Sequence, residues 1–313
     1  MVTEMSTLGI KVDVDTHRGM KEGVPRLIRI FSAHGIRASF FISMGRDNSG
    51  KAIFRFFTRR GFLKKMLRSN AVGMYGIRTA LSGTLLPARQ IARSFPDIFR
   101  ALIEHGHEVG IHGYDHVRWH DRLPRMSYEE TREEIRKACD AYQEITGRKP
   151  GSSAAPGWTC SPHQLAIQDG LPMRYHSDSR GECPFFPVME GRSYSHLQIP
   201  TTLSTLDELL GSGGCRSEDD LACHYVGRIM AAPSNVLTIH AEAEGMAWAE
   251  WCDQLLGELA GKGVTFVRLC EIADASLADQ ARVPHCELRM GEIPGRAGQV
   301  ALQIRSESDQ SRS

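Results

Sequence analysis

The chain has 313 residues, of which 41% are hydrophobic, so it is long and apolar enough to bury a full core. Its 38 Lys and Arg nearly balance its 37 Asp and Glu, which argues against a protein that coats nucleic acid through bulk charge. Its 8 cysteines form no C-x-x-C pair, which argues against a zinc knuckle or a disulfide framework and indicates reduced thiols.

The first predicted element is a strand over residues 8–14, because apolar residues alternate there with polar ones. Lys11 and Asp13 fall on one face of this strand, and Asp15 follows on the same side just after it. Two carboxylates therefore stand at the C-terminal end of the first buried strand. Asp is also common where strands end in turns, so this position alone does not decide between structure and function.

The following segments alternate between helical and strand patterns. A helix is predicted over residues 22–35 and a strand over 36–43, which together with the first strand make a βα unit. A helix from Ser127 to Ile145 opens with a capping box and ends at Gly147. The other predicted helices cover residues 98–105 and 247–260, and the other predicted strands cover 107–112, 152–154, 173–177, 197–199, 235–241 and 264–269.

Seven or eight strands with interspersed helices predict an α/β fold, a distorted (β/α)7 TIM-like barrel with a basic amphipathic insertion. A doubly wound open sheet is the competing layout. We expect a single domain over residues 1–275, interrupted by an insertion at 48–96, and a loosely held polar tail over 276–313. The chain shows neither the pattern of a signal peptide at its N-terminus nor an apolar run of about 20 residues that would cross a bilayer.

The insertion at residues 48–96 holds ten Lys or Arg residues, no acidic residue and many bulky apolar side chains. This composition is typical of a segment that lies in an anionic membrane interface. A solvated basic helix that covers the barrel is an equally simple interpretation, and nucleic-acid binding is less favoured because the rest of the chain supplies no basic field. The candidate membrane-docking residues are Arg55, Phe56, Phe57, Arg59, Arg60, Phe62, Lys64 and Lys65.

Histidines follow two of the later predicted strands. His112 and His116 come directly after the strand residues 107–111, and on a helical turn their spacing would put both imidazoles on one face. His240 ends the strand at 235–241. The same edge of a parallel barrel carries Asp13 and Asp15, so these side chains together predict a catalytic site for one divalent metal ion with open coordination positions. A single buried, structural histidine remains the alternative for His240.

These residues resemble the polysaccharide (NodB-type) deacetylases, which are metal-dependent amide hydrolases on a distorted (β/α)7 barrel. Longer strings, among them KMLRSNA, SDSRG, QIPTTL and TIHAEAEG, are similar to one branch of that family. That branch removes a formyl group from an undecaprenyl-phosphate-linked formamido sugar in lipid A modification, which confers resistance to cationic antimicrobial peptides. The resemblance covers residues 9–269.

The resemblance implies a role for each matching residue. Asp13 would be the general base, His240 the general acid, and Asp15, His112 and His116 the ligands of a metal that could be Zn, Mn, Co, Ni or Fe. The family's Arg-x-Pro-x-Gly motif is absent, because "SAAPG" places Ser153 or Ala154 where the arginine would brace the base. Arg180 is the predicted substitute. The predicted substrate-binding residues are Tyr114, Trp158, Asp178, Arg180 and Glu242.

The resemblance also implies a peripheral position on the cytoplasmic side of a bacterial inner membrane. The predicted partners are the undecaprenyl-phosphate-linked formamido sugar and an anionic membrane surface, and no nucleic acid. Two other functions remain open: a deacetylase of acetylated amino sugars, and a non-catalytic membrane-binding homologue. All five proposed catalytic and ligand positions are filled, which argues against the non-catalytic alternative.

Overall fold

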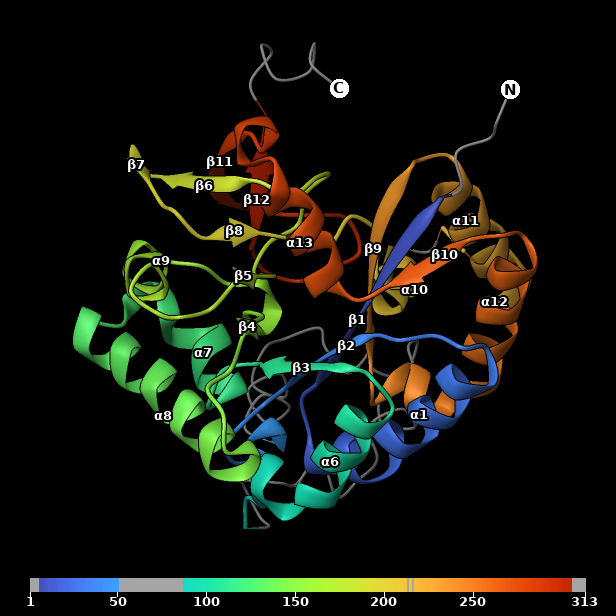
Figure 1. Ribbon diagram of the computed structural model, residues 1–313, viewed down its shortest axis with the longest axis horizontal. Coiled ribbons are helices and arrows are strands. Elements are labelled where there is room, and N and C mark those ends of the chain that lie inside the picture. Colours follow the sequence, from blue (N-terminus) through green and yellow to red (C-terminus); the bar gives the residue numbers. More distant parts are fainter. Residues whose placement is uncertain (1–5, 51–86, 213, 216, 306–313) are drawn as a thin grey trace, which may run out of the picture.

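The larger sheet of the protein is parallel and curled. The computed structural model describes residues 6–50, 87–212, 214–215 and 217–305. The sheet runs in the order β10-β1-β2-β3-β4-β5-β8, and β9 pairs with β1 (Figure 1). Its strands are β1 (Thr7–Val14), β2 (Ser39–Ile42), β3 (Glu108–Ile111), β4 (Ser152–Ser153), β5 (Tyr175–His176), β8 (Leu197–Gln198), β9 (Ser234–His240) and β10 (Thr265–Val267).

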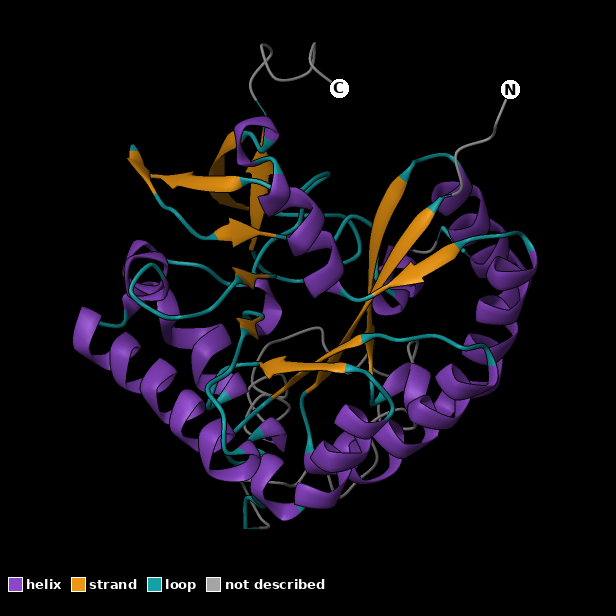
Figure 2. Ribbon diagram, in the orientation of Figure 1, coloured by secondary structure: helices purple, strands orange, loops and turns teal. Residues whose placement is uncertain are grey.

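The segment that follows β8 curls back onto β9. The amide of Thr202 donates to the carbonyl oxygen of Val236 at 3.1 Å, and the hydroxyls of Thr201 and Thr238 are hydrogen-bonded at 2.7 Å. Helices lie around the outside of this curled sheet (Figure 2). The arrangement confirms the predicted distorted barrel, and the doubly wound open sheet is wrong.

The helices follow the strands in the βα rhythm that parallel pairing requires. The capping box of Ser127 and Glu130 is confirmed, and Gly147 closes the same helix at a φ of 72°. The α-helices are α1 (Val24–Ala33), α6 (Pro96–Glu104), α7 (His116–Arg122), α8 (Tyr128–Thr146), α9 (Pro162–Gln168), α10 (Leu206–Ser212), α11 (Glu218–Met230), α12 (Ala249–Gly261) and α13 (Leu269–Ala278). Single turns of other helix types are η1 (Gly19–Gly23), η2 (Ala92–Ser94), η3 (Leu123–Arg125), η4 (Pro156–Trp158), η5 (Ala243–Ala247) and η6 (Gln280–Arg282).

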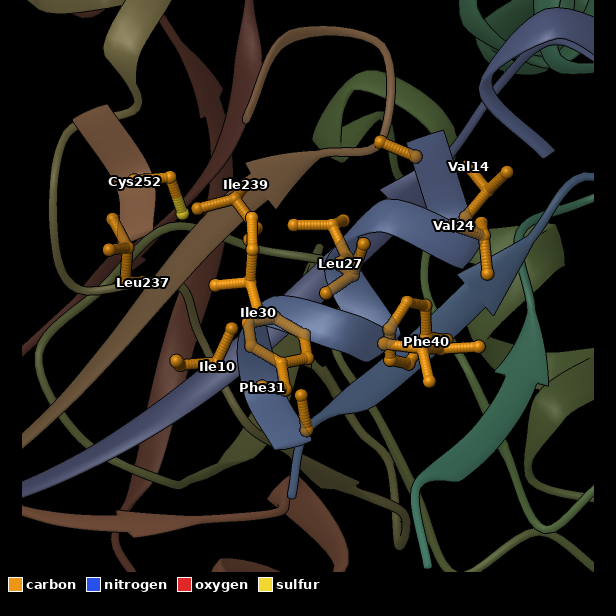
Figure 3. Close-up of a cluster of buried hydrophobic side chains, with 14 of the residues drawn as sticks. Ile10, Val14, Val24, Leu27, Ile30, Phe31, Phe40, Leu237, Ile239 and Cys252 are labelled. Carbon is orange, nitrogen blue, oxygen red and sulfur yellow. The ribbon is translucent and has the colours of Figure 1, made fainter. Parts of the chain in front are cut away.

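The two faces of β1 have different surroundings. Its apolar face, with Ile10 and Val14, packs in the main hydrophobic core beside Leu27 and Phe31 of α1 and Ile239 of β9 (Figure 3). Burying each such side chain contributes about 1.5–3 kcal/mol, which holds α1 against the sheet. The other face is buried as well, although it carries the polar residues that the site uses.

A second, smaller sheet contains the C-terminal part of the described chain. It runs in the order β12-β11-β6-β7, with β11 parallel to β6. Cys286, Leu288 and Ala301 are buried in a core that it shares with Phe185. The expectation of a loosely held tail is therefore wrong for residues 285–304. The strands are β6 (Phe186–Met189), β7 (Arg192–Ser193), β11 (His285–Gly291) and β12 (Val300–Ile304).

The polar composition of this C-terminal segment concealed a strand pattern. Cys286, Leu288 and Met290 alternate with Glu287 and Arg289, and such alternation is typical of a strand that buries one face. None of the helices in the described ranges is both long and apolar enough to cross a membrane.

Candidate active site

Three parallel strands bring their C-terminal ends together. Asp13 lies in β1 opposite His240, the last residue of β9, and Asp15 follows β1 directly. On the other side of β1, β2 separates it from β3, whose end is followed by His112. Parallel pairing in this register therefore gathers side chains that are up to 227 residues apart in the sequence; in one hydrogen bond, a carboxylate oxygen of Glu242 accepts from the Asp15 amide.

Asp15, His112 and His116 form a compact set of metal-ligating groups. One ligand atom from each lies within 4.8 Å of the other two. The Nε2 atoms of His112 and His116 are 3.3 Å and 3.5 Å from the two carboxylate oxygens of Asp15. His112 Nδ1 donates to the carbonyl oxygen of Ala154 at 3.0 Å, which leaves the Nε2 lone pair of the neutral ring directed toward Asp15.

The electrostatics of this set suit a cation. Burial lowers the pKa of His112 and of His116 to about 4, so both rings are neutral at pH 7, as ligands must be. Asp15 Oδ1 is buried and accepts no hydrogen bond from the described residues. A buried acceptor without a donor is costly unless a cation meets it. These three residues therefore fit a divalent metal ion, as the sequence predicted.

The local geometry of the two histidines differs from the prediction. His112 follows β3, whereas His116 is the first residue of α7, so they do not share one helical turn. Asp115 between them is extended and its carboxylate caps α7 by accepting from the Arg118 amide. The strand end and the helix start, rather than helical spacing, bring the two rings to a centroid distance of 5.3 Å.

Asp13 lies next to the metal-ligating set and closest to a buried lysine. Its Oδ2 atom lies 3.3 Å from Lys11 Nζ and 3.9 Å from His112 Nε2. Burial raises the pKa of Asp13, but neighbouring positive charges, that of Lys11 above all and also that of His240, outweigh burial and hold this pKa below its ordinary value. Asp13 Oδ1 accepts no hydrogen bond from the described residues.

Lys11, and not the predicted Arg180, is the cation that lies beside Asp13. Its side chain is 0% exposed, its Nζ donates to the carbonyl oxygen of Ser177 at 3.2 Å, and it lies 5.2 Å from the ring centroid of Trp158. Arg180 instead forms an ion pair with Glu208 at 2.6 Å. The prediction that Arg180 replaces the brace is therefore wrong, and the alternation of β1 already placed Lys11 on the face of Asp13.

His240 stands among acidic groups. Burial lowers its pKa, but the charges of Asp15, Asp207, Asp13 and Glu244 overcome burial and raise the pKa to about 9. The backbone amide of His240 also donates to Glu244 at 2.9 Å. His240 is therefore protonated at neutral pH. The sequence does not single out Asp207, in the first turn of α10, because its local pattern is that of any acid that begins a helix.

Glu242 holds the turn that follows β1. One of its carboxylate oxygens accepts from the amide of Asp15 at 3.0 Å, and from the amide and hydroxyl of Thr16 at 2.8 Å each. A Cβ on Gly19 would lie 2.0 Å from the same oxygen, so only glycine fits there. The residue is buried and its contacts are internal, which does not support the predicted substrate contact.

The remaining predicted substrate-binding residues also have internal contacts. Asp178 is 0% exposed, and one carboxylate oxygen accepts from Gln164, Gln168 and Gln198, so it lies away from any solvent-borne substrate. Trp158 is buried and donates to Thr201. These internal contacts do not support the predicted substrate contacts of Asp178 and Trp158, which stay predictions.

Tyr114 is partly buried on the loop between β3 and α7, where its carbonyl oxygen accepts from the Gly45 amide at 2.8 Å. Its ring lies 5.9 Å from Lys137 Nζ. Its predicted substrate contact stays a prediction. The eight candidate membrane-docking residues lie outside the described residues.

Comparison with known proteins gives a consistent family. A model described as "Polysaccharide deacetylase" matches residues 8–176. A protein of Shewanella sediminis, described as a probable 4-deoxy-4-formamido-L-arabinose-phosphoundecaprenol deformylase ArnD, is 36% identical over 96% of this chain and 95% of its own length. A protein of Wigglesworthia glossinidia brevipalpis with the same description is 29% identical over 91% of this chain and 98% of its own length.

Solved structures agree on the fold. A structure from Mycobacterium smegmatis, described as belonging to a polysaccharide deacetylase, superposes with a TM-score of 0.64 at 17% identity and covers 93% of this chain and 96% of that one. At this identity the likeness concerns the fold alone. It shows that the curled sheet and the elements around it form an arrangement already seen in solved structures.

Proposed function

Because the chain belongs to the polysaccharide deacetylase family of amide hydrolases, we propose that it is a metal-dependent deformylase. The proposed substrate is 4-deoxy-4-formamido-L-arabinose-phosphoundecaprenol, and the products are formate and the corresponding 4-amino sugar lipid. The relatives over nearly the full length of the chain support this substrate. The proposed reaction belongs to lipid A modification.

The observation that carries the proposal is the different surroundings of the two aspartates. Asp15 lies against His112 and His116, whereas Asp13 lies against Lys11. If both carboxylates bound a metal, no base would remain on this strand. The separation supports one ligand and one free base, which amide hydrolysis by an activated water requires.

The groups of the site can each supply one part of the reaction. A divalent metal held by Asp15, His112 and His116 would polarise the formyl oxygen and make a bound water more acidic. Asp13 is ionised at neutral pH and has a carboxylate oxygen without a hydrogen-bond donor among the described residues, so it can take a proton from the attacking water. Lys11 keeps the Asp13 carboxylate in one orientation.

The amine is a poor leaving group unless its nitrogen is protonated. His240 is protonated at neutral pH, with a pKa of about 9, and its strand places it opposite Asp13. It can therefore donate a proton to the nitrogen as the C–N bond breaks. The base and the acid lie on paired strands, and the released amine would carry the proton that His240 gave.

We further propose that the basic insertion docks the enzyme on an anionic membrane surface that contains the substrate. Its sequence supports this, since each basic residue near such a surface contributes about 1 kcal/mol. The two described ends of the insertion lie together, because the Asp47 amide donates to the Arg89 carbonyl oxygen at 2.8 Å. Asp47 also accepts from the His17 amide, just beyond the β1 aspartates.

Replacing Phe56, Phe57 and Phe62 with Ser tests the docking. Hydrolysis of vesicle-bound lipid should weaken, while hydrolysis of a soluble head-group analogue should be unchanged. Equal losses on the two substrates would contradict docking and would leave the deformylase proposal intact.

The deformylase proposal is tested by incubating purified protein with the formylated lipid and with each candidate metal in turn. We expect formate release that depends on added metal and stops with a chelator. An N-acetyl analogue of the same sugar lipid serves as the matched control. Faster release of acetate than of formate would favour a deacetylase, and release of neither product would reject the proposal.

A further inference from the structure

The connection between β11 and β12 lies directly on α10. A Cβ on Gly295 would be 2.1 Å from the carbonyl oxygen of Glu208, and a Cβ on Gly211 would be 2.6 Å from the carbonyl oxygen of Gly295. Gly295 has a φ of 80°, which other residues rarely adopt. The small C-terminal sheet therefore presents a tightly fitted loop to the first turn of α10.

Arg296 extends from this loop onto the ring of Trp158. Its guanidinium carbon is 4.6 Å from the ring centroid, and its Nη1 atom is 3.7 Å from Glu208 Oε1. The side chain remains 16% exposed. Stacking of this kind holds a guanidinium in one plane and leaves its N–H edge free to bind.

The N–H groups of Arg296 are not used within the described part of the protein, where the guanidinium donates no hydrogen bond. Glu208, its acidic neighbour, already accepts from Arg180 at 2.6 Å and 2.8 Å and from the amide of Thr205 at 3.0 Å. The contact between Arg296 and Glu208 is longer than a hydrogen bond. The arginine is thus oriented and still able to hold an anion.

Arg296 lies between two helices, α10 and α7, that are both connected to the candidate active site. On one side, Asp207 comes directly before Glu208 in α10, and the charge of Asp207 interacts with both His240 and Arg296. On the other side, a Cβ on Gly157 would lie 3.4 Å from Arg296 Nη2 and 2.3 Å from His120 Cδ2.

His120 belongs to α7, and the first residue of that helix is the metal-ligating His116. Arg296 therefore lies between the helix that carries a metal ligand and the helix turn that faces the proposed general acid. The charge of Asp207 acts on both His240 and Arg296, so a sugar whose amide nitrogen approaches His240 would turn the far side of its ring toward this loop.

We propose that Arg296 is an anion-binding residue that holds the phosphodiester between the sugar and its lipid. This inference rests on the proposed function, in which that phosphodiester is the single negative charge of the substrate and lies across the sugar ring from the amide. The planar, permanently charged guanidinium matches two phosphate oxygens. The family model ends at residue 176, well before this loop.

The test compares two soluble substrates. One is a short-chain alkyl phosphodiester of the 4-formamido sugar, and the other is its neutral alkyl glycoside. In Arg296→Met, kcat/KM for the phosphodiester should fall about tenfold to a hundredfold, the usual effect of losing a hydrogen bond to a charged group, while the glycoside should be hydrolysed as by the wild type. In Arg296→Lys, kcat/KM should fall by less, and only for the phosphodiester.

Arg289→Met is the matched control, because Arg289 is an exposed arginine of the same hairpin that pairs with Glu287. It should leave both substrates unaffected. Equal losses on the two substrates in Arg296→Met, or no loss, would overturn the inference. The inference would also be overturned if inorganic phosphate inhibited the wild type and the wild type did not prefer the phosphodiester to the glycoside. Arg296 would then bind free phosphate rather than the substrate. If the wild type releases formate from neither substrate, the proposed function itself fails.

Discussion

Two regions of the protein bury charge in different ways. In the first, which we call the scaffold pair, Arg180 and Glu208 are joined by two hydrogen bonds of 2.6 Å and 2.8 Å. The guanidinium also donates to the carbonyl oxygens of Thr201 and Leu203, and the carboxylate accepts from the Thr205 amide. The donors and acceptors of this ion pair are matched inside the fold.

The second region, the catalytic rim, has four carboxyl groups and four basic groups, and two of the basic groups, His112 and His116, are neutral at pH 7. It is defined by the side chains at the ends of β1, β3 and β9, namely Lys11, Asp13, Asp15, His112, His116, His240, Glu242 and Glu244. Burial raises the pKa of Glu242 to about 8 and that of Glu244 to about 7. One oxygen each of Asp13, Asp15 and Glu242 accepts no hydrogen bond from the described residues.

The difference shows which buried charges remain available to bind a ligand. A matched buried pair is stable but has nothing left to bind, whereas a surplus of buried carboxylates is costly until a cation arrives. The scaffold pair therefore supports structure, and the catalytic rim is suited to a divalent metal. The four predictions below test this contrast, beginning with the largest effect.

Removing the charge of Asp13 should give the largest effect. In Asp13→Asn we expect kcat for formate release to fall about 10²- to 10⁴-fold, the usual contribution of a general base. Bound metal, measured by elemental analysis, should be retained. Asp15→Asn is the paired variant and should lose both metal and activity. Loss of metal from Asp13→Asn, or full turnover by it, would contradict the division between the two aspartates.

Removing the charge of Lys11 should also act on turnover. Lys11→Met leaves Asp13 without its ion pair, and we expect kcat to fall about tenfold to a hundredfold while KM changes little. Lys11→Arg keeps the charge and should recover part of kcat. Lys21→Met, an exposed lysine of η1, is the control. A change in KM alone would instead indicate that Lys11 contacts the substrate.

Breaking the scaffold pair should affect stability rather than turnover. Arg180→Met leaves Glu208 buried without its partner, so the free energy of unfolding in urea should fall by about 3–5 kcal/mol. Formate release per folded molecule should be unchanged. The double variant Arg180→Met with Glu208→Leu should recover part of the stability. A loss of kcat/KM at unchanged stability would restore the predicted substrate contact of Arg180.

The sequence predicted the strands that carry the site because their patterns are local. β1, β3 and β9 are apolar runs with polar residues at their ends, and parallel strands bring such ends to one edge. The candidate metal ligands could therefore be named without a structure. The strands β6, β11 and β12 were not predicted because they lie outside the repeating βα pattern, and three of the seven residues of β11 are His, Glu or Arg.

The role of Lys11 could not be predicted, because the ammonium group of a lysine in a strand is ordinarily exposed to water. Its burial depends on Trp158 and Ser177, which lie 147 and 166 residues away in the sequence. Arg180 was chosen for its charge alone, and its partner Glu208 is 28 residues away. Pairing of buried charges is decided by tertiary contacts that a single sequence does not display.

Glu244 gives the smallest of the four effects and the sharpest test of the surplus of acid. Its pKa is raised by burial from 4.5 to about 7, so the folded state holds a proton that the unfolded state releases. This contribution to stability is complete below pH 4.5 and is lost as the pH rises to about 7. In Glu244→Gln this contribution cannot be lost, because the amide side chain does not ionise. The variant should therefore gain stability over the wild type by up to about 3 kcal/mol between pH 4.5 and pH 7.

Urea unfolding at pH 5, 6, 7 and 8 measures this difference, in metal-free protein so that no added cation neutralises the rim. Glu250→Gln, a glutamate that is 90% exposed, should follow the wild type at every pH. Parallel profiles for Glu244→Gln and the wild type would mean that the charge of Glu244 is matched in the fold, as that of Glu208 is. The catalytic rim would then have no surplus of acid around His240, and the contrast with the scaffold pair would rest on Asp13 and Asp15 alone.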